Sequence, residues 1–399
     1  MVEARPSPVR SPLLVSSPEA LDRALDVLRS AERLAIDCES NGMHAWRGRL
    51  CVMQLAVALP DESAEHVVLV DTLAVTDLSP LAPLLGPSGP EKILHDSGFD
   101  ARLLRDAGVT LARVIDTSVY ARFLGLRETG LATLLATRFG VTLEKTLQQH
   151  DWAQRPLGAR EEAYLAGDVR DLGRLASSLE RDAASVGIEA EVREETAYAL
   201  RQAVSDRDEV GADGVARPLY TRIKGARELG AGARSALREV CEVRERAAER
   251  WDTPSGRVLS NAALLSVAKA RPRKGADVRA MGVLQGRALE LADSVAEAVS
   301  RGIARGDIPH EERRWFVSER TPSDLGLRKA REALLTHWRA EEARRRGVDL
   351  QVILPGHCLA DLASRGAKNL AELRAIDGFG EVRVDRYGPA LVALINSVS

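Results

Sequence analysis

The fold is decided between residues 33 and 71, which carry the runs Arg33-Leu-Ala-Ile-Asp37, Leu50-Cys-Val-Met-Gln-Leu-Ala-Val57 and His66-Val-Val-Leu-Val-Asp71. Each run is rich in β-branched residues or is bounded by Gly, Pro or Asp, which is typical of strands. Two shorter runs, Lys92–His95 and Arg113–Asp116, predict one further short strand each. These strands are the beginning of a sheet.

Helical periodicity follows the first strands and continues between the later ones. The expected helices are 78–85, 101–107, 118–124, 131–139 and 160–184, followed by a polar helical stretch over 186–204. Strands that come first and then mix with helices predict an α/β domain, which we place at residues 15–205.

The rest of the chain reads as helical throughout. A stretch dense in Asp and Gly, 206–217, separates it from the α/β domain, and a second boundary lies within 302–323. The segments on either side of that second boundary repeat one design, because Leu237…Trp251 pairs with Leu334…Arg344, and both copies end in a helix after a Gly-containing loop. We therefore predict two all-α helical modules, at residues 214–302 and 321–399.

The composition is that of an ordinary globular chain of 399 residues, with 45% hydrophobic and 29% charged residues. The longest apolar run, Leu50–Leu59, is too short for a membrane span, and Met1–Glu19 lacks the apolar core of a signal peptide. The cysteines, at 38, 51, 241 and 358, form no C-x-x-C pair. No membrane association and a reducing cytoplasm are the expectations.

The net charge of −2 conceals an asymmetry along the chain. Residues 1–213 hold 23 Lys/Arg against 34 Asp/Glu, residues 214–301 hold 17 against 10, and residues 302–399 hold 16 against 14, giving −11, +7 and +2. The acidic first stretch suggests a domain whose carboxylates bind metal, and the basic second stretch suggests a domain that binds a polyanion. Drift in surface charge explains the same numbers equally well.

Asp37 and Glu39 stand at the end of the first predicted strand, with Cys38 between them. Side chains alternate across a strand, so the two carboxylates face one way and Cys38 faces the core. Adjacent carboxylates repel each other unless a cation lies between them, and oxygen ligands suit a hard divalent metal. D-x-E is nevertheless common at strand ends, and this pair alone is weak support for a metal site.

Two other groups of polar residues have simpler explanations when taken alone. His95-Asp-Ser-Gly-Phe-Asp100 opens a helix, where Asp96 and Asp100 can serve as helix caps. Tyr164 and Asp168 lie four apart and share a helix face, but their neighbours Glu161, Glu162, Arg170 and Asp171 are typical of a solvated surface.

The order of these groups is more informative than any of them. D-x-E on a strand, then H-x-x-x-x-D ending at Asp100, then Y-x-x-x-D ending at Asp168 after Asp151-Trp-Ala-Gln-Arg-Pro-Leu157, resembles the DEDD 3′→5′ exonucleases of the tyrosine subgroup. Within them the chain is most similar to the ribonuclease D family, in which an exonuclease domain precedes two HRDC domains. Cys38 stands where that family often has Thr.

The resemblance implies a ribonuclease H-like mixed sheet flanked by helices, followed by two HRDC domains. It implies that Asp37, Glu39, Asp100 and Asp168 hold two Mg²⁺ ions, with Mn²⁺ as a substitute, and that Tyr164 orients the attacking water. By resemblance Asp37 bridges the ions. The expected products are nucleoside 5′-monophosphates released from the 3′ ends of RNA, such as tRNA precursors or other structured RNA with a 3′ tail.

Residues outside the carboxylate set are candidate substrate contacts. They are Gln54, His95 and Phe99 in the front domain, and Arg271 and Lys274 in a basic loop that also holds Lys269 and Arg273. Phosphate contacts from such a loop are independent of sequence and sensitive to salt. Phe99, Trp46, Tyr120 and Phe123 are expected in the core or in pocket walls rather than stacked on bases. The Ile376-Asp-Gly-Phe-Gly380 turn resembles a helix-hairpin-helix phosphate grip, or is a plain turn between helices.

Two rivals to a cytoplasmic, monomeric exoribonuclease stay open. A 3′→5′ DNA exonuclease in DNA repair would use the same acids, because no residue can be identified as the partner of a 2′-hydroxyl. A catalytically silent nucleic-acid-binding scaffold is the rival from another class, although all five expected catalytic positions are present. A helicase is excluded because the sequence has no G-x-x-x-x-G-K-[ST] loop.

Overall fold

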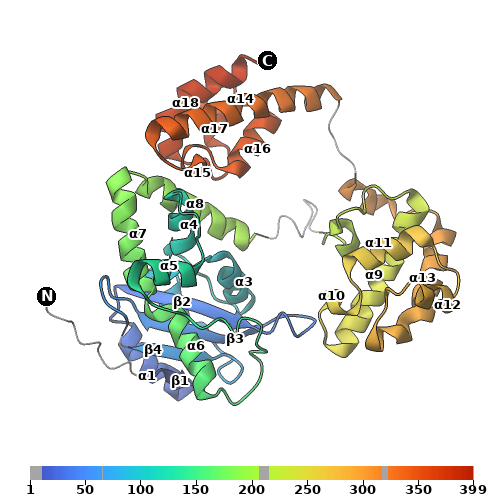
Figure 1. Cartoon of the computed structure of the whole chain (residues 1–399), viewed down its shortest axis with the longest axis horizontal. Coiled ribbons are helices and arrows are strands. Elements are labelled where there is room, and N and C mark those ends of the chain that lie inside the picture. Colours follow the sequence, from blue (N-terminus) through green and yellow to red (C-terminus); the bar gives the residue numbers. More distant parts are fainter. Residues whose placement is uncertain (1–10, 65, 206–214, 317–321, 399) are drawn as a thin grey trace. The chain divides into compact units, whose positions relative to one another are not determined.

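The computed structural model of the chain describes residues 11–64, 66–205, 215–316 and 322–398 (Figure 1). The chain forms two compact units. The first contains residues 1–40, 49–204 and 320–399, and the second contains residues 41–48 and 205–319. The α/β region and the last helical module therefore belong to one unit, and the first helical module belongs to the other.

The centre of the first unit is a six-stranded mixed sheet in the order β1-β4-β3-β2-β5-β6. Its strands are β1 (Leu13–Val15), β2 (Arg33–Ser40), β3 (Leu50–Val57), β4 (Val67–Asp71), β5 (Glu91–Leu94) and β6 (Val114–Asp116). The pairs of β3 with β2 and with β4 are antiparallel, whereas β1 with β4, β2 with β5 and β5 with β6 are parallel. The mixed sheet that the sequence predicted is confirmed.

Helices cover both faces of this sheet. They are α1 (Pro18–Leu28), α2 (Ala82–Leu85), α3 (Gly98–Asp106), α4 (Thr117–Phe123), α5 (Leu131–Phe139), α6 (Ala159–Arg170), α7 (Leu172–Val186) and α8 (Glu189–Ala203). A 3₁₀ turn over Ser79–Leu81 leads into α2. One core contains Ile36 and Cys38 of β2 with buried residues of α1 and α3, and the other contains Ala35 with those of α4 to α7.

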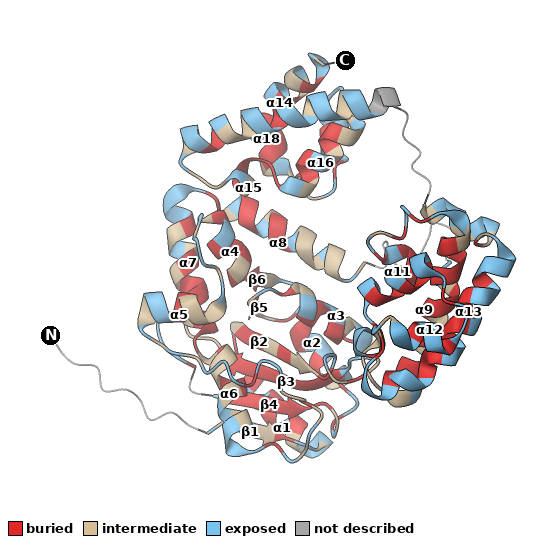
Figure 2. Cartoon of the chain, turned by 45° about the vertical axis from the view of Figure 1, so that its right-hand side comes forward, coloured by how far each residue is buried: buried red, intermediate tan, exposed pale blue. Residues whose placement is uncertain are grey.

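Alternation along β2 places its carboxylates on a defined face. Ile36 and Cys38 are buried in the core shared with α1 and α3, as the strand period of two requires. Asp37 and Glu39 therefore share the opposite face with Ala35, toward the core that includes α6 and α7. Figure 2 shows that β3 is almost wholly buried, whereas β2 has partly buried positions, which include Asp37 and Glu39.

The second unit is a helical module with a core of its own. It contains 3₁₀ turns at Leu219–Arg222, Gly286–Leu291 and His310–Trp315, and the helices α9 (Ala231–Trp251), α10 (Ser255–Val258), α11 (Asn261–Ala270), α12 (Gly275–Ala280) and α13 (Ala292–Arg305). The longest helix, α9, packs along α13. The loop 41–48 belongs to this unit, and Trp46 packs at the edge of its core.

The last helical module repeats that order of elements. Its helices are α14 (Pro322–Arg346), α15 (Leu350–Ile353), α16 (Gly356–Arg365), α17 (Leu370–Arg374) and α18 (Glu381–Asn396). A long helix, a single turn, a helix of ten residues, a short helix and a final long helix recur in both modules. The predicted repeat of two helical modules is confirmed.

The last module also packs against the α/β region, which the sequence did not predict. Val352 of α15 is fully buried in the same core as α4 to α7, and α18 lies against α8. Because a fully buried Val contributes about 1.5–3 kcal/mol, this packing is part of what stabilises the first unit.

Two elements near the N-terminus escaped prediction. α1 begins after Ser17, whose side chain accepts a hydrogen bond from the Ala20 N–H, and Pro18 occupies its first turn. Leu21, Ala24, Leu25 and Leu28 are buried at helical spacing. β1 has only three residues and exists because β4 pairs with it, so no local pattern identifies it.

The helix expected over 160–184 is two helices, α6 and α7, that meet at Asp171. The carbonyl of Arg170 accepts a hydrogen bond from the Ala64 N–H at 2.8 Å, and the buried Asp171 carboxylate accepts one from the Ser63 hydroxyl at 2.6 Å. Asp171 was expected on a solvated helix face, and that expectation is wrong. Within the described ranges, no helix combines the length and the apolar character that crossing a bilayer requires.

Candidate active site

The two carboxylates of β2 meet a third from α6. One oxygen atom each of Asp37, Glu39 and Asp168 lies within 4.8 Å of the other two. Asp37 and Glu39 share a strand face, and α6 packs against β2, which brings Asp168 to the pair. Asp168 lies more than 120 positions after Asp37 and Glu39 in the sequence, and the tertiary structure brings it to them.

The site holds these carboxylates at an electrostatic cost. Burial raises the pKa of Asp37 to about 6. Burial and the charges of Asp37 and Asp168 raise the pKa of Glu39 to about 9, and burial together with Asp37 raises that of Asp168 to about 8. Like charges in a desolvated site favour the protonated form, and a divalent cation among the oxygens reverses that preference. The oxygen-only donor set fits a hard divalent ion.

Asp100 is the fourth expected carboxylate and lies in the first turn of α3. It is buried, and burial and the charge of Asp37 raise its pKa well above the usual value. It is not one of the three residues whose oxygens lie within 4.8 Å of each other, so its place is beside that group. Burial and the charge of Asp100 raise the pKa of the Cys38 thiol, which lies between Asp37 and Glu39 in the sequence.

The loop before α3 is fixed by Asp116, which sequence reasoning did not single out. The Asp116 carboxylate accepts hydrogen bonds from the backbone N–H groups of Asp96 and Ser97 and from the Ser97 hydroxyl, at 2.8–3.1 Å. It also caps the start of α4. Asp96 adopts a left-handed backbone with φ 66°, and no side chain caps α3. The expectation that Asp96 is a helix cap is therefore wrong.

Tyr164 lies one helical turn before Asp168 on α6. Its half-buried ring packs against Trp152, with ring centroids 5.5 Å apart. Burial and the charges of Asp168 and Glu39 raise the pKa of Tyr164, so the phenol keeps its proton at neutral pH and can donate a hydrogen bond. Trp152 itself is fully buried.

The segment 151–157 before α6 is fastened to the sheet by an ion pair. The Nε and Nη2 atoms of Arg155 donate to the two carboxylate oxygens of Asp71 at 2.7 and 2.8 Å, and Nη2 also donates to the Cys51 carbonyl at 2.9 Å. Planar guanidinium and carboxylate groups form such two-point contacts with defined geometry. The signal was present in the sequence as Arg155 of the D-W-x-x-R-P-L segment.

Gln54 is fully buried on β3, and its backbone is paired with Asp37 in the register of the sheet. Residues directly opposite in an antiparallel pair project from the same face, so the Gln54 amide lies on the carboxylate face. Among the described residues, neither the Nε2 nor the Oε1 atom of this side chain has a hydrogen-bond partner. Leaving a buried amide unsatisfied is energetically costly.

The remaining candidate substrate contacts lie in different surroundings. The Nδ1 atom of His95 is 2.8 Å from the Thr117 hydroxyl, and burial lowers the pKa of this imidazole. Phe99, next to Asp100, is 47% exposed, so it is not a core residue. Tyr120 and Phe123 are buried as expected.

The basic loop of the sequence lies in the second unit. Arg271 ends α11 with a left-handed backbone, φ 52°, and Lys274 immediately precedes α12. Lys269, Arg271, Arg273 and Lys274 are all exposed. Four exposed cations within six residues form a surface suited to phosphate groups.

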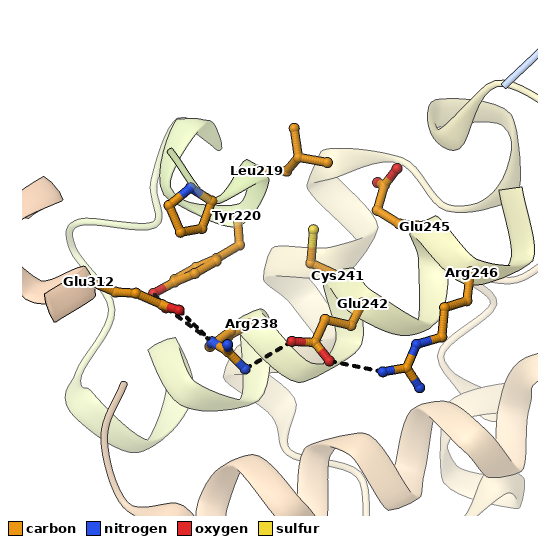
Figure 3. Close-up of a pocket in the computed structure, with 9 residues that line it drawn as sticks. Leu219, Tyr220, Arg238, Cys241, Glu242, Glu245, Arg246 and Glu312 are labelled. Atoms are coloured by element: carbon orange, nitrogen blue, oxygen red, sulfur yellow. Dashed lines mark hydrogen bonds and ion pairs between the residues drawn. The ribbon is translucent and has the colours of Figure 1, made fainter. Parts of the chain in front are cut away.

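The second unit also contains a pocket of about 280 Å³ (Figure 3). It is lined by Pro218, Leu219, Tyr220, Arg238, Cys241, Glu242, Glu245, Arg246 and Glu312. Its charges are paired in a chain, because Arg238 binds Glu312 and Glu242, and Arg246 binds Glu242 (Figure 3). These pairs join α9 to the 3₁₀ turn that holds Glu312, and they account for the charged groups that Figure 3 links.

Comparison with protein families identifies the parts of the chain. Residues 13–184 match the family described as 3′-5′ exonuclease, and residues 233–299 and 328–395 each match the HRDC domain. These three matches cover the sheet domain, the second unit and the last helical module, respectively. The fold class predicted from the sequence is confirmed.

Curated relatives match most of the length of this chain. Ribonuclease D of Gluconacetobacter diazotrophicus is 30% identical over 337 residues, which are 80% of this chain and 79% of the relative. Ribonuclease D of Haemophilus influenzae is 29% identical over 302 residues, 74% of this chain and 72% of the relative. Among solved structures, Escherichia coli RNase D, described as an exoribonuclease involved in structured RNA processing, covers 97% of this chain and 99% of its own, with 22% identity and a TM-score of 0.70. The chain therefore belongs to the ribonuclease D family of 3′→5′ exoribonucleases.

Proposed function

We propose that this protein is a Mg²⁺-dependent 3′→5′ exoribonuclease that trims the 3′ ends of structured RNA, such as tRNA precursors, and releases nucleoside 5′-monophosphates. The observation that carries the proposal is the group of carboxylate oxygens from Asp37, Glu39 and Asp168, which lie within 4.8 Å of one another beside the helix turn that holds Tyr164. Membership of the ribonuclease D family supports the reaction type.

In this proposal four carboxylates hold two Mg²⁺ ions, with Mn²⁺ as a substitute. Asp37, Glu39 and Asp168 would hold one ion, and Asp37 and Asp100 would hold the second. The ions, when bound, supply a nucleophilic water near neutral pH and stabilise the leaving 3′ oxygen. The raised pKa values of the acids support this assignment, because a cation is the simplest compensation for so many carboxyl groups in one place.

The chain's other groups position the reactants. The Tyr164 hydroxyl, which stays protonated, donates a hydrogen bond that orients the attacking water. The Gln54 amide, buried on the Asp37 face of the sheet, contacts the terminal nucleotide. We assign His95 and Phe99, which flank the loop that leads to Asp100, to the same nucleotide. Arg271 and Lys274 bind RNA phosphates farther along the strand.

The proposal includes the setting of the enzyme. We propose that it acts as a monomer in the cytoplasm. All four cysteines are buried and unbridged, which is in keeping with a reducing compartment.

A direct test uses end-labelled RNA and DNA of one sequence, each with either a 3′-hydroxyl or a 3′-phosphate, incubated with the full chain and Mg²⁺. We expect RNA with a free 3′-hydroxyl to shorten in single-nucleotide steps to 5′-monophosphates. Asp100→Asn should stop the shortening, whereas Asp106→Asn, on the exposed end of the same helix, should not. Preferential shortening of DNA would identify a DNA exonuclease, and binding without turnover would identify a scaffold.

A further inference from the structure

The Gly378-Phe-Gly380 turn before α18 has the form of a phosphate grip, yet a side chain of the same chain already fills it. Gly378 and Gly380 both have positive φ, at 79° and 82°, and α18 begins immediately after them. The start of a helix presents unpaired N–H groups and a partial positive charge, which together bind anions. In a helix-hairpin-helix element that anion would be a nucleic-acid phosphate.

The anion found there is the carboxylate of Glu194 on α8 of the exonuclease domain. Its Oε1 accepts a hydrogen bond from the Val382 N–H at 3.2 Å. Its Oε2 lies 3.4 Å from Nη1 of Arg383. A backbone N–H at the helix start and a guanidinium thus both contact this one carboxylate, as they would a bound anion.

The glycine at position 380 is required by this contact. A Cβ atom there would lie 2.0 Å from Oε2 of Glu194, so any other residue would displace the carboxylate. A Cβ at position 378 would lie 2.5 Å from the Tyr198 ring of the same helix α8. Both glycines thus let α8 approach the turn closely, and left-handed backbone is the conformation that glycine tolerates best.

The buried charge of Arg383 is the reason why the last module needs the contact with Glu194. The Arg383 side chain is fully buried, and it donates to the carbonyls of Val352 and Phe379 at 3.0 and 3.1 Å. Carbonyls satisfy its N–H groups but do not neutralise its charge, and a buried charge without a counterion is costly. Glu194 supplies the carboxylate that pairs with it.

Further contacts surround this pair along α8. Tyr198 stacks on His357 of α16 with ring centroids 3.8 Å apart and planes 6° apart. Arg201 and Gln202 bind Asp377, which begins the glycine turn, at 3.0 and 2.8 Å. One continuous face of α8 is thereby matched to the turn and to its supporting helix.

We propose that the glycine turn of the last HRDC domain is a docking site for the chain's own exonuclease helix α8, with Glu194 occupying the place of a phosphate, and that this turn does not bind RNA. The domain is then a permanent brace of the exonuclease fold, and the RNA contacts of the protein come from other surfaces. This inference goes beyond the proposed function and does not rest on it, because its test requires no turnover.

The test measures backbone amide exchange of the full chain by mass spectrometry. Glu194→Gln keeps the shape of the side chain and removes its charge. We expect amides of residues 380–384, together with those of 191–195, to exchange at least about tenfold faster, because the docked helices open more often. The matched control is Glu381→Gln, which removes a carboxylate from the same helix start; that side chain is largely exposed and pairs with Arg374 instead. It should leave both segments unchanged.

A second arm adds a single-stranded oligouridylate in EDTA, so that the RNA binds without being cut. We expect the exchange of residues 380–384 and 191–195 in the wild-type chain to stay the same at saturating RNA. Slower exchange at 380–384, or release of 191–195, would show that RNA enters the turn and would overturn the proposal. Equal exchange in Glu194→Gln and Glu381→Gln would overturn it as well, because Glu194 would then not hold the turn.

Discussion

Arg155 and Asp71 form a two-point ion pair, with Nε to Oδ2 at 2.7 Å and Nη2 to Oδ1 at 2.8 Å, although 84 residues separate them in the sequence. Burial of Asp71 opposes its ionisation, but the hydrogen bonds and the charge of Arg155 together keep the pKa of Asp71 below its usual value. The pair joins the end of β4 to the segment that carries Trp152, on which the Tyr164 ring packs. The position of the Tyr164 ring in the candidate site thus depends on an ion pair that lies outside the site.

Arg155→Lys should therefore lower activity without removing any candidate metal ligand. Lysine keeps the charge but cannot make the two-point contact, so the segment 151–157 and the Tyr164 ring lose their fixed position. We expect kcat to fall more than the Mg²⁺ affinity, which titration of activity would report. Asp71→Asn should behave in the same way, and the double variant should be no worse than either single one. Additive losses would argue against a shared role.

Asp37→Asn should abolish hydrolysis and leave the fold and the affinity for RNA nearly intact. The substitution removes one charged oxygen from the three-carboxylate group and preserves the shape of the side chain. Because Asp37 also raises the pKa values of its neighbours, the variant should melt at a higher temperature than wild type in EDTA. Activity assays and thermal melts check the two effects separately. Asp106→Asn serves as the surface control, and wild-type turnover in Asp37→Asn would refute the site.

Tyr164→Phe should lower kcat by about 100-fold and leave KM almost unchanged. A hydrogen bond to the attacking water that strengthens in the transition state affects the rate at saturating substrate. The ring packing against Trp152 should survive, because only the hydroxyl is removed. Steady-state kinetics with a short single-stranded RNA measures both constants. An unchanged kcat would make Tyr164 a packing residue.

Metal-free protein should lose stability as the pH rises from about 5 to 9. Glu39 and Asp168 have raised pKa values of about 9 and 8, whereas unfolded carboxyl groups titrate near 4. The folded state therefore binds more protons in this window, and its stability is fully present below pH 4 and is lost as the pH passes the folded values. Mg²⁺ should restore more stability at pH 8.5 than at pH 5.5. Thermal melts in EDTA and in Mg²⁺ at both pH values test this.

The matched variant for that experiment is Glu39→Gln, which cannot ionise. It should melt at a temperature that depends less on pH in EDTA than wild type does. If the stability of the metal-free wild-type protein instead rose steadily up to pH 9, the raised pKa values of Glu39 and Asp168 in the folded state would be contradicted.

The basic loop of the second unit should supply salt-sensitive RNA affinity. Arg271→Gln combined with Lys274→Gln removes two exposed charges, and each lost phosphate contact should reduce the slope of log K against log[salt] by about 0.7–0.9. Binding isotherms of a tRNA precursor at several salt concentrations, in EDTA, give the slope. Arg29→Gln, directly after α1, is the control, because Arg29 is an exposed arginine that pairs with Asp26. An unchanged slope would remove this loop from the RNA interface.

A chain shortened to residue 206 also tests whether catalysis lies in the front domain and RNA affinity in the helical modules. Its result is harder to interpret, because the truncation also removes packing contacts. That chain keeps Asp37, Glu39, Asp100, Tyr164 and Asp168, and from the sequence it should still cut short single-stranded RNA while binding long RNA weakly. It also loses Val352 from the core around α4 to α7 and the partners of Glu194. We expect it to melt at a lower temperature than the full chain, so its RNA affinity must be compared at a temperature where it is folded.

The sequence determined most of the elements and the identity of the acids. Apolar runs at strand spacing predicted β2 to β6, and alternation alone placed Asp37 and Glu39 on one face and Cys38 on the other. The repeat of helix order predicted two modules. These properties are local, because they depend on the period of the backbone and on the residues next to one another in the chain.

The tertiary structure alone decided which distant residues meet. Asp168 reaches Asp37 because α6 packs on the sheet, Arg155 finds Asp71 across 84 positions, and Glu194 fills a glycine turn that from the sequence was equally a phosphate grip. No local pattern encodes these contacts, since each exists only once two separately formed surfaces pack together and one buried charge needs another. For this reason the sequence alone allowed two interpretations of the Gly378-Phe-Gly380 motif, a phosphate-binding turn or a plain turn between helices. In the structure, helix α8 is its partner.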